Sequence, residues 1–129
     1  MNILDENISI LERQFLEDCR VRVRHLGHDI GRMGMADEEI IPFLHQHPGA
    51  TLFTSDRDFF HRDLCHPRYC LVCLFVSRSQ TAIYIRRALG HPNLRTRAER
   101  LGKVIGVRPE RLHVWELHTR ERMELDWPE

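Results

Sequence analysis

The chain has 129 residues, of which 42% are hydrophobic and 29% are charged, and its formal net charge is zero. This length suits one domain that buries roughly two-thirds of the surface of the unfolded chain, so the fold needs no disulfide or metal to hold it together. A neutral balance gives by itself no affinity for nucleic acid or membrane. No apolar stretch approaches the ~20 residues that span a bilayer, and no secretory signal is visible. We therefore expect a soluble, cytoplasmic protein without a membrane partner.

Charge is distributed unevenly along the chain. Residues 1–63 contain twelve acids and seven arginines, net −5, whereas residues 64–129 contain seven acids and twelve Arg and Lys, net +5. An acidic half that holds a metal and a basic half that contacts phosphates would suit a nuclease, but ordinary solvated helices also produce such a division. Lys103 is the only lysine. Arginine suits phosphate geometry, and a compositional bias of the genome explains the preference equally well.

The first elements alternate between strand and helix. Residues 1–4 are short and apolar and predict a strand. Ser9 and Glu12 form a capping box for a helix whose apolar residues continue at helical spacing to Leu26, and Gly27 ends it. A brief strand over residues 27–30 and a flexible turn over 31–34 follow. Asp37 then caps a second helix, which Pro42 distorts or shortens.

The remaining elements continue the alternation. Residues 50–54 predict a strand, and residues 71–76 predict another that is apolar enough to be buried on both faces. Residues 80–89 and 93–106 predict helices, and residues 112–117 predict a last strand.

This order of elements predicts an α/β fold. We expect a single three-layer domain over residues 1–118, with a mainly parallel sheet flanked by helices. Residues 119–129 are polar and form either a C-terminal tail or an edge element.

Acids follow two of the expected strands. Asp5 ends the first apolar run, and Asp56 and Asp58 follow the run at 50–54. Ligands of parallel sheets collect at the carboxyl ends of the strands, so these acids converge there, and Asp37 joins them if it opens the helix between those strands. Converging carboxylates repel one another unless a cation or protons separate them. Four oxygen ligands without Cys or His suit Mg²⁺ or Mn²⁺ rather than zinc.

Each acid also has an ordinary structural explanation. Asp37 serves as an N-cap, Asp58 as the cap of a short helix that begins at Phe59, and Asp5 and Asp56 as loop residues. Capping does not, however, require Asp at the ends of both strands as well as at the helix between them. The combination therefore predicts a metal site at Asp5, Asp37, Asp56 and Asp58.

The four cysteines favour reduced thiols because the chain shows no export signal. A zinc site is an alternative, since Cys65 and His66 precede a Cys-x2-Cys pair formed by Cys70 and Cys73. The apolar run around Cys70 and Cys73 favours small buried strand residues instead.

Four segments occur in the order and spacing of a branch of small prokaryotic PIN-like domains, which the first half of the chain resembles. They are Ile3-Leu4-Asp5-Glu6-Asn7, Leu26-Gly27-His28-Asp29, Ala36-Asp37-Glu38-Glu39-Ile40 and Thr54-Ser55-Asp56-Arg57-Asp58-Phe59. The Thr-x-Asp-x-Asp-Phe segment is the most specific of these.

The resemblance implies a function. PIN domains are typically Mg²⁺- or Mn²⁺-dependent ribonucleases, and many are toxins of toxin–antitoxin pairs. By this resemblance the catalytic and metal-binding residues are Asp5, Asp37, Asp56 and Asp58, with Glu38 as a substitute for Asp37. RNA is the implied substrate, a cognate antitoxin the implied protein partner, and a homodimer the implied assembly.

Specific roles follow as hypotheses. Asp5 and Asp56 are direct metal ligands, and Asp37 and Asp58 bind directly or through water. Arg57 either reaches the scissile phosphate or pairs with a neighbouring carboxylate. A further set of arginines either tracks phosphates or forms a plain solvated helix face: Arg86, Arg87, Arg95, Arg97 and Arg100.

Two other function classes compete with the nuclease. The first is a non-catalytic PIN-like module that binds protein or RNA. The second is a phosphoacceptor receiver-like domain, which needs a lysine at the end of a late strand. Lys103 is expected in a helix, so the second class ranks low.

Overall fold

The computed structural model describes residues 1–129 and has an α/β fold built on one seven-stranded sheet. The strand order is β2-β1-β3-β4-β5-β6-β7. The strands are β1 Asn2–Leu4, β2 Arg24–His25, β3 Ala50–Thr54, β4 Tyr69–Leu74, β5 Lys103–Val107, β6 Arg111–Glu116 and β7 Met123–Asp126. The helices are α1 Ile10–Asp18, α2 Asp37–His45, α3 Thr81–Gly90 and α4 Arg97–Arg100, with 3₁₀ turns η1 Arg57–Phe59, η2 Arg62–Leu64 and η3 Arg78–Gln80.

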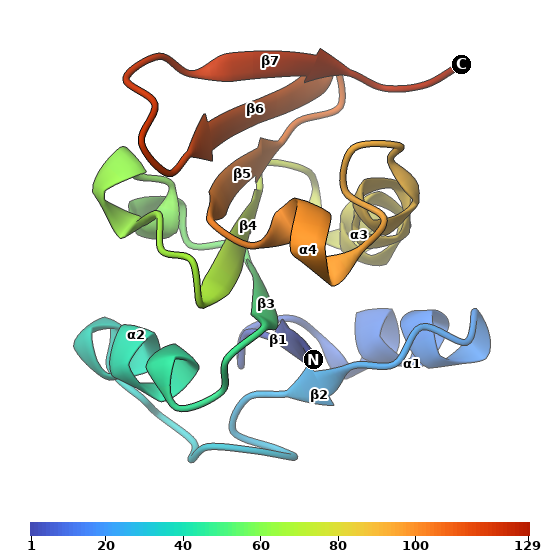
Figure 1. The fold of residues 1–129 in the computed structure, drawn as a ribbon. Helices are drawn as coiled ribbons and strands as arrows, with labels where there is room; N and C mark the ends of the chain where they lie inside the picture. Colours follow the sequence, from blue (N-terminus) through green and yellow to red (C-terminus); the bar gives the residue numbers. More distant parts are fainter.

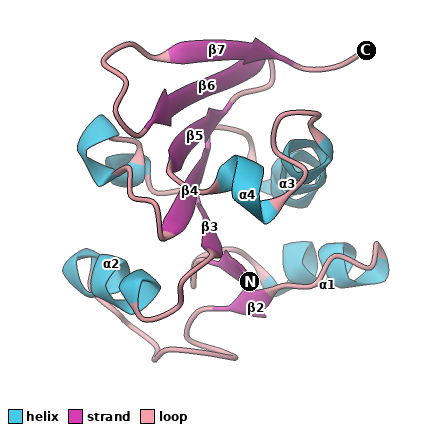
Figure 2. Cartoon of the chain, viewed as in Figure 1, coloured by secondary structure: helices cyan, strands magenta, loops and turns pink.

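The sheet is mostly parallel. Strands β1 to β5 pair in parallel, whereas β6 and β7 add to the β5 edge in antiparallel orientation. Helices α1 and α3 cover one face, and α2 with the turn η1 covers the other (Figures 1 and 2). The predicted α/β class with a mainly parallel sheet flanked by helices is confirmed.

Strand β4 lies between two hydrophobic cores. All six of its residues are buried, as the continuous apolar run predicts for a central parallel strand. Cys70 belongs to the core under α1 and α3, and Cys73 belongs to the core under α2, on the opposite face. Burial raises the pKa of Cys70 to about 12 and raises that of Cys73 further. Two thiols on opposite faces of one strand cannot hold the same ion, so the zinc alternative is wrong.

The first helix is shorter than its sequence pattern predicts. Ser9 Oγ accepts the N–H of Glu12 at 3.2 Å, as expected for its cap. The helix ends at Asp18 instead of Gly27, because Arg20 adopts a left-handed conformation with φ 63°. The N–H of Val21 then reaches the carbonyl of Leu16 at 2.9 Å and closes a Schellman motif. The second strand is accordingly Arg24–His25 and not residues 27–30.

The helix predicted over residues 93–106 is also wrong. Thr96 and Glu99 form a capping box for the four-residue helix α4, and Gly102, at φ 87°, turns the chain into β5. Val104, Ile105 and Val107 are fully buried in that strand beside β4. Lys103 therefore begins a strand, and the late-strand lysine of a receiver-like site is missing from the carboxyl end of β5.

The helices are short and partly amphipathic. Helix α1 buries Leu16 but leaves Leu11 81% exposed and Ile10 55% exposed. Helix α3 buries most of its apolar residues and leaves Ile83 partly exposed. No helix combines the length and apolar character that a membrane-spanning segment requires.

The C-terminal segment contains an edge strand that is tied to α3. Strand β7 pairs with β6, and the next residue, Trp127, donates its indole N–H to the carbonyl of Arg108 at 2.9 Å. The Arg87 guanidinium lies 4.3 Å from the centre of a Trp127 ring, and Tyr84 lies beside it. His91 Nε2 and the Asp126 carbonyl are 2.9 Å apart.

Replacing Trp127 with Ala is expected to lower the free energy of unfolding by about 2 kcal/mol, because a half-buried aromatic ring and its cation–π contact are lost. Urea denaturation measures the change. Trp127→Phe keeps a ring and is expected to lose about half as much. An unchanged midpoint in Trp127→Ala would show that this segment adds nothing to stability.

Candidate metal centre

The carboxyl ends of β1 and β3 lie side by side and bring the predicted acids to one edge of the sheet. The two strands pair in parallel, with Leu4 opposite Phe53. The N–H of Asp5 continues this ladder by donating to the carbonyl of Phe53 at 2.9 Å. The acids that follow the strands therefore begin from adjacent positions, as parallel pairing requires.

Three of the four predicted acids form a close group. Asp37, Asp56 and Asp58 each offer a carboxylate oxygen, and these oxygens all lie within 4.8 Å of one another. Asp37 and Asp58 are exposed, and Asp56 is partly buried. The group is open to solvent, so an ion can reach it without any movement of the chain.

The turn after β3 positions two members of this group. Asp56 Oδ1 accepts the N–H of Asp58 at 2.9 Å and caps η1. Thr54 Oγ1 accepts the N–H of Asp56 at 3.0 Å, and buried Phe59 anchors the turn from below. The N-cap of this turn is Asp56, so the structural explanation that made Asp58 the cap is wrong, and the Asp58 carboxylate has no capping role.

Asp37 is the first residue of α2 and does not cap it. Ala36 is the N-cap and has no side-chain hydrogen bond, while Glu39 Oε1 accepts the N–H of Ala36 at 3.4 Å. The predicted capping role of Asp37 is therefore wrong. Its carboxylate instead faces Asp56 and Asp58. Glu38, the predicted substitute, lies outside the group of three.

Glu6 holds the loop that leads to α2. Both of its carboxylate oxygens accept the N–H of Gly34 at 3.0 Å. This contact joins the end of β1 to a position 28 residues later and brings the start of α2 over the strand ends. The sequence analysis assigned no role to Glu6, which directly follows Asp5.

Asp5 lies behind the group rather than in it. It is 8% exposed, its Oδ1 accepts the N–H of Glu6 at 2.8 Å, and its Oδ2 accepts the Thr54 hydroxyl at 2.9 Å. Burial raises the pKa of Asp5, and the charge of Asp56 adds to this effect. Because Thr54 bonds both acids, Asp5 fixes the hydroxyl that in turn holds Asp56. The structure thus supports a positioning role for Asp5 in place of direct ligation.

Mutual repulsion affects the group. Desolvation by the surrounding atoms raises the pKa of Asp37, and the negative charge of Asp56 raises it further. The sequence correctly placed these like charges together, and no basic side chain forms an ion pair with any of the three. A divalent cation would relieve this repulsion.

Arg57, between Asp56 and Asp58 in the turn after β3, belongs to a cluster of two arginines and two aromatic rings. The guanidinium of Arg57 lies 5.3 Å from the centre of the Phe75 ring, and that of Arg108 lies 4.4 Å from it. Phe60 meets Phe75 edge-on at 5.4 Å. Gly106 gives these rings room, because a Cβ there would lie 2.9 Å from Phe60 Cε1.

Neither arginine pairs with a carboxylate. Arg57 and Arg108 form no ion pair, so the alternative in which Arg57 neutralises a neighbouring acid is wrong. Stacking on Phe75 orients each planar guanidinium while its N–H groups stay available to an anion. Sequence reasoning missed Arg108 and Phe75, since they follow different strands.

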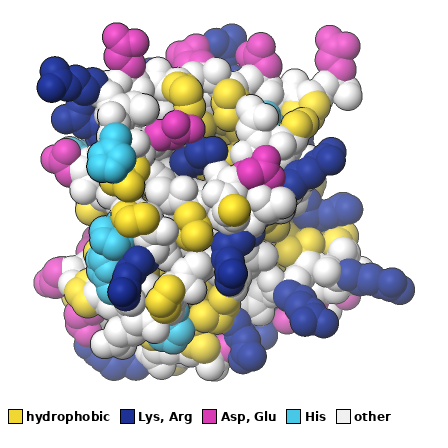
Figure 3. All heavy atoms as spheres, in the orientation of Figure 1, with side chains coloured by type: hydrophobic (Ala, Val, Ile, Leu, Met, Phe, Trp, Pro, Cys, Tyr) yellow, Lys and Arg dark blue, Asp and Glu magenta, His cyan; other side chains and the backbone are white.

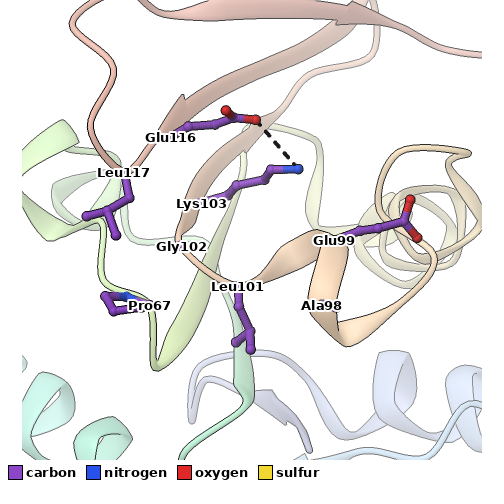
Figure 4. A pocket seen from close by; sticks show the side chains of 8 residues that line it. All are labelled: Pro67, Ala98, Glu99, Leu101, Gly102, Lys103, Glu116 and Leu117. Carbon is purple, nitrogen blue, oxygen red and sulfur yellow. Dashed lines mark ion pairs between the residues drawn. The ribbon is translucent and has the colours of Figure 1, made fainter.

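The predicted arginine face is divided in the structure. Arg87, on α3, lies over the Trp127 ring. Arg97 and Arg100 belong to α4, at the edge where the parallel strands begin. A separate cavity of about 320 Å³ lies at that edge and contains the ion pair of Lys103 and Glu116 at 3.6 Å (Figure 4). None of the four predicted acids lines it.

Comparison with known proteins gives no match: no family model, no curated protein and no solved structure is significantly similar to the chain.

Replacing Asp56 with Asn is expected to raise the metal-free stability at pH 7 by about 0.5 kcal/mol, a small value because exposed charges are screened. Asn keeps the capping oxygen but removes a charge that raises the pKa of Asp5 and Asp37. A carboxyl group whose pKa is raised in the folded state destabilises the fold above that pKa and not below its unfolded value. The gain should therefore disappear as the pH falls below about 4.

Thermal unfolding in a chelator, at neutral and acidic pH, measures this difference. Asp63→Asn, a change of an exposed acid outside the group, is the control and should leave stability nearly unchanged. Added Mg²⁺ should raise the melting temperature of the original protein and have little effect on Asp56→Asn. Equal responses of the two proteins would contradict a metal centre at Asp56.

Proposed function

We propose that this protein is a metal-dependent ribonuclease of PIN-like type, which hydrolyses RNA at the group formed by Asp37, Asp56 and Asp58. One observation carries the proposal: three carboxylate oxygens lie within 4.8 Å of one another without a basic partner. Like charges at this separation disfavour the ionised state unless a cation is bound. Repelling carboxylates held together at an exposed edge of the sheet are suited to bind a cation.

The donor set fits Mg²⁺ or Mn²⁺. All three side chains offer oxygen, and no Cys or His belongs to the group. Hard divalent cations prefer such ligands, and Mg²⁺ commonly binds through a few carboxylates while it keeps several waters. When bound, such an ion neutralises charge on the phosphate and lowers the pKa of a bound water.

The protein groups around the acids have complementary roles in this proposal. Asp37, Asp56 and Asp58 hold the ion, and Asp5 positions Asp56 through the Thr54 hydroxyl. Arg57 and Arg108 bind non-bridging oxygens of the RNA phosphate. Their stacking on Phe75 limits the freedom of the guanidinium groups, which reduces the entropy lost on binding.

RNA as substrate, and an antitoxin as partner, come from the PIN-like resemblance of the first half of the chain. In this proposal an antitoxin would cover the acidic edge and so block both metal and RNA. The arginines beside the acids favour a phosphate-containing substrate and support the nuclease over a module that only holds a structural cation.

Asp56→Asn is expected to lower Mg²⁺- or Mn²⁺-dependent cleavage of single-stranded RNA at least about a hundredfold, since it removes a metal ligand and not only an outer group. Gel analysis of labelled RNA measures cleavage, with chelator as the blank. Asp63→Asn should cleave like the original protein.

A calorimetric titration with Mg²⁺ and Mn²⁺ accompanies this assay. Saturable binding that Asp56→Asn loses supports the assignment. If the original protein and Asp56→Asn cleave RNA at equal rates, the cleavage comes from elsewhere. Metal binding without any cleavage would favour the non-catalytic interaction module.

A further inference from the structure

The edge where the parallel strands begin carries the opposite charge from the edge where they end. Arg24 opens β2, and Arg68 directly precedes β4. Arg97, from α4, covers the turn that starts β3: a Cβ at Gly49 would lie 3.0 Å from Arg97 Cδ. We call this surface the amino edge, defined by Arg20, Arg22, Arg24, Arg68, Arg95, Arg97 and Arg100 and the strand starts between them.

At one end of the amino edge, backbone and side-chain contacts join the start of β1 to Arg22 and Arg24. Asn2 Nδ2 donates to the carbonyl of Arg22 at 3.3 Å, and Arg24 pairs with Ile3 in the sheet. A shallow cavity of about 300 Å³ is lined there by Met1, Asn2 and residues 22–24. Arg22 and Arg24 are both exposed beside it.

The β3 and β4 end is connected to the same surface. Arg100 Nε donates to Thr51 Oγ1 at 3.2 Å, and the N–H of Thr51 donates to the carbonyl of Met1 at 2.9 Å. Further along, the N–H of Gly49 donates to the carbonyl of Arg68 at 2.7 Å. The arginines from three separate segments therefore form one strip along neighbouring strands.

Few acids lie beside these arginines: Glu17 lines a cavity with Arg20, Arg22 and Arg24, but it pairs with Arg13. No Asp or Glu occurs in residues 20–24, 46–51, 66–69 or 93–98. None of the seven arginines forms an ion pair. The nearby Glu99 is engaged by the backbone and hydroxyl of Thr96. Figure 3 views this edge and shows basic side chains gathered around the start of the chain, in the lower half of the picture.

Ring systems flank the strip beside Arg68. Arg68 donates to the carbonyl of His45 at 3.1 Å. The rings of His45 and His66 lie 4.3 Å apart, and His66 stacks on Tyr69. Imidazole faces next to guanidinium groups are typical of surfaces that contact bases and phosphates of single strands.

We propose that the amino edge binds the phosphate backbone of a single-stranded nucleic acid, as a site separate from the acidic group. Guanidinium groups without acidic partners supply the phosphate contacts, and His45 and His66 supply ring faces. An anionic membrane fits less well, because Met1 is the only large apolar side chain exposed on this surface. The binding needs no metal and does not depend on cleavage at the opposite edge.

The test measures binding of a labelled RNA single strand of about 16 nucleotides by fluorescence anisotropy, in chelator so that no divalent metal contributes. The variant Arg24→Glu/Arg68→Glu/Arg97→Glu is expected to bind at least about tenfold more weakly than the original protein at about 50 mM salt. The slope of log K against log salt should fall in magnitude by about 2, as three phosphate contacts are lost.

The variant Arg78→Glu/Arg86→Glu/Arg122→Glu is the matched control. It makes the same change in net charge at exposed arginines outside the amino edge and should retain most of the binding. Circular dichroism checks the fold of both variants, and the single variant Arg24→Glu gives a smaller loss if the triple variant fails to fold. Equal losses in the two triple variants would overturn the proposal, because binding would then follow net charge alone.

Two further measurements separate this proposal from its competitors. Binding in chelator and cleavage with Mg²⁺ are measured separately on the original protein, so a failure of cleavage and a failure of amino-edge binding give different results. Vesicles of phosphatidylcholine with phosphatidylglycerol test the membrane alternative by co-sedimentation. Binding to these vesicles without binding to RNA would overturn the proposal.

Discussion

Parallel hydrogen bonding between β1 and β3 fixes where the charged residues of this protein lie. The pairing joins segments that are far apart in sequence, since Asp5 and Thr54 are separated by 49 positions and still share a hydrogen bond. Parallel strands all point the same way, so every residue that follows a strand reaches one edge of the sheet and every residue that precedes a strand reaches the other. Acids follow β1 and β3, whereas arginines precede β2 and β4. A chain with zero net charge thus acquires two edges of opposite sign.

The acidic edge combines rigid support with exposed, repelling charges. Thr54 links Asp5 to the backbone of Asp56, Phe59 anchors the turn, and Glu6 ties down the loop before α2. These contacts hold Asp37, Asp56 and Asp58 close together although their charges oppose it. Holding like charges together lowers the stability of the fold. Such destabilising arrangements are typical of functional sites, where preorganised side chains reduce the free-energy cost of binding.

The sequence-based prediction failed where the same residues fit both the spacing of a helix and that of a strand. Val23 and Leu26 continue the helical spacing of α1, but in the structure they flank β2, and Arg20 ends the helix in a left-handed conformation that sequence rules assign to glycine. Residues 103–107 likewise fit a helix locally. They become strand β5 because β4 offers them a parallel partner and a fully buried position. Local propensity cannot decide such cases, since the free energy comes from contacts with distant segments.

The sequence by itself determined the α/β class, the strands β3 and β4, and the proximity of Asp37, Asp56 and Asp58, because alternating patterns, apolar runs and the edge rule for parallel sheets depend on local order alone. Only the tertiary structure decided that Asp5 is buried behind Thr54, that Cys70 and Cys73 face opposite cores, and that Arg57 and Arg108 meet on Phe75. The physical reason is the same in each case. The direction of a side chain, and the partners within its reach, are set by how strands and loops from distant parts of the chain pack together.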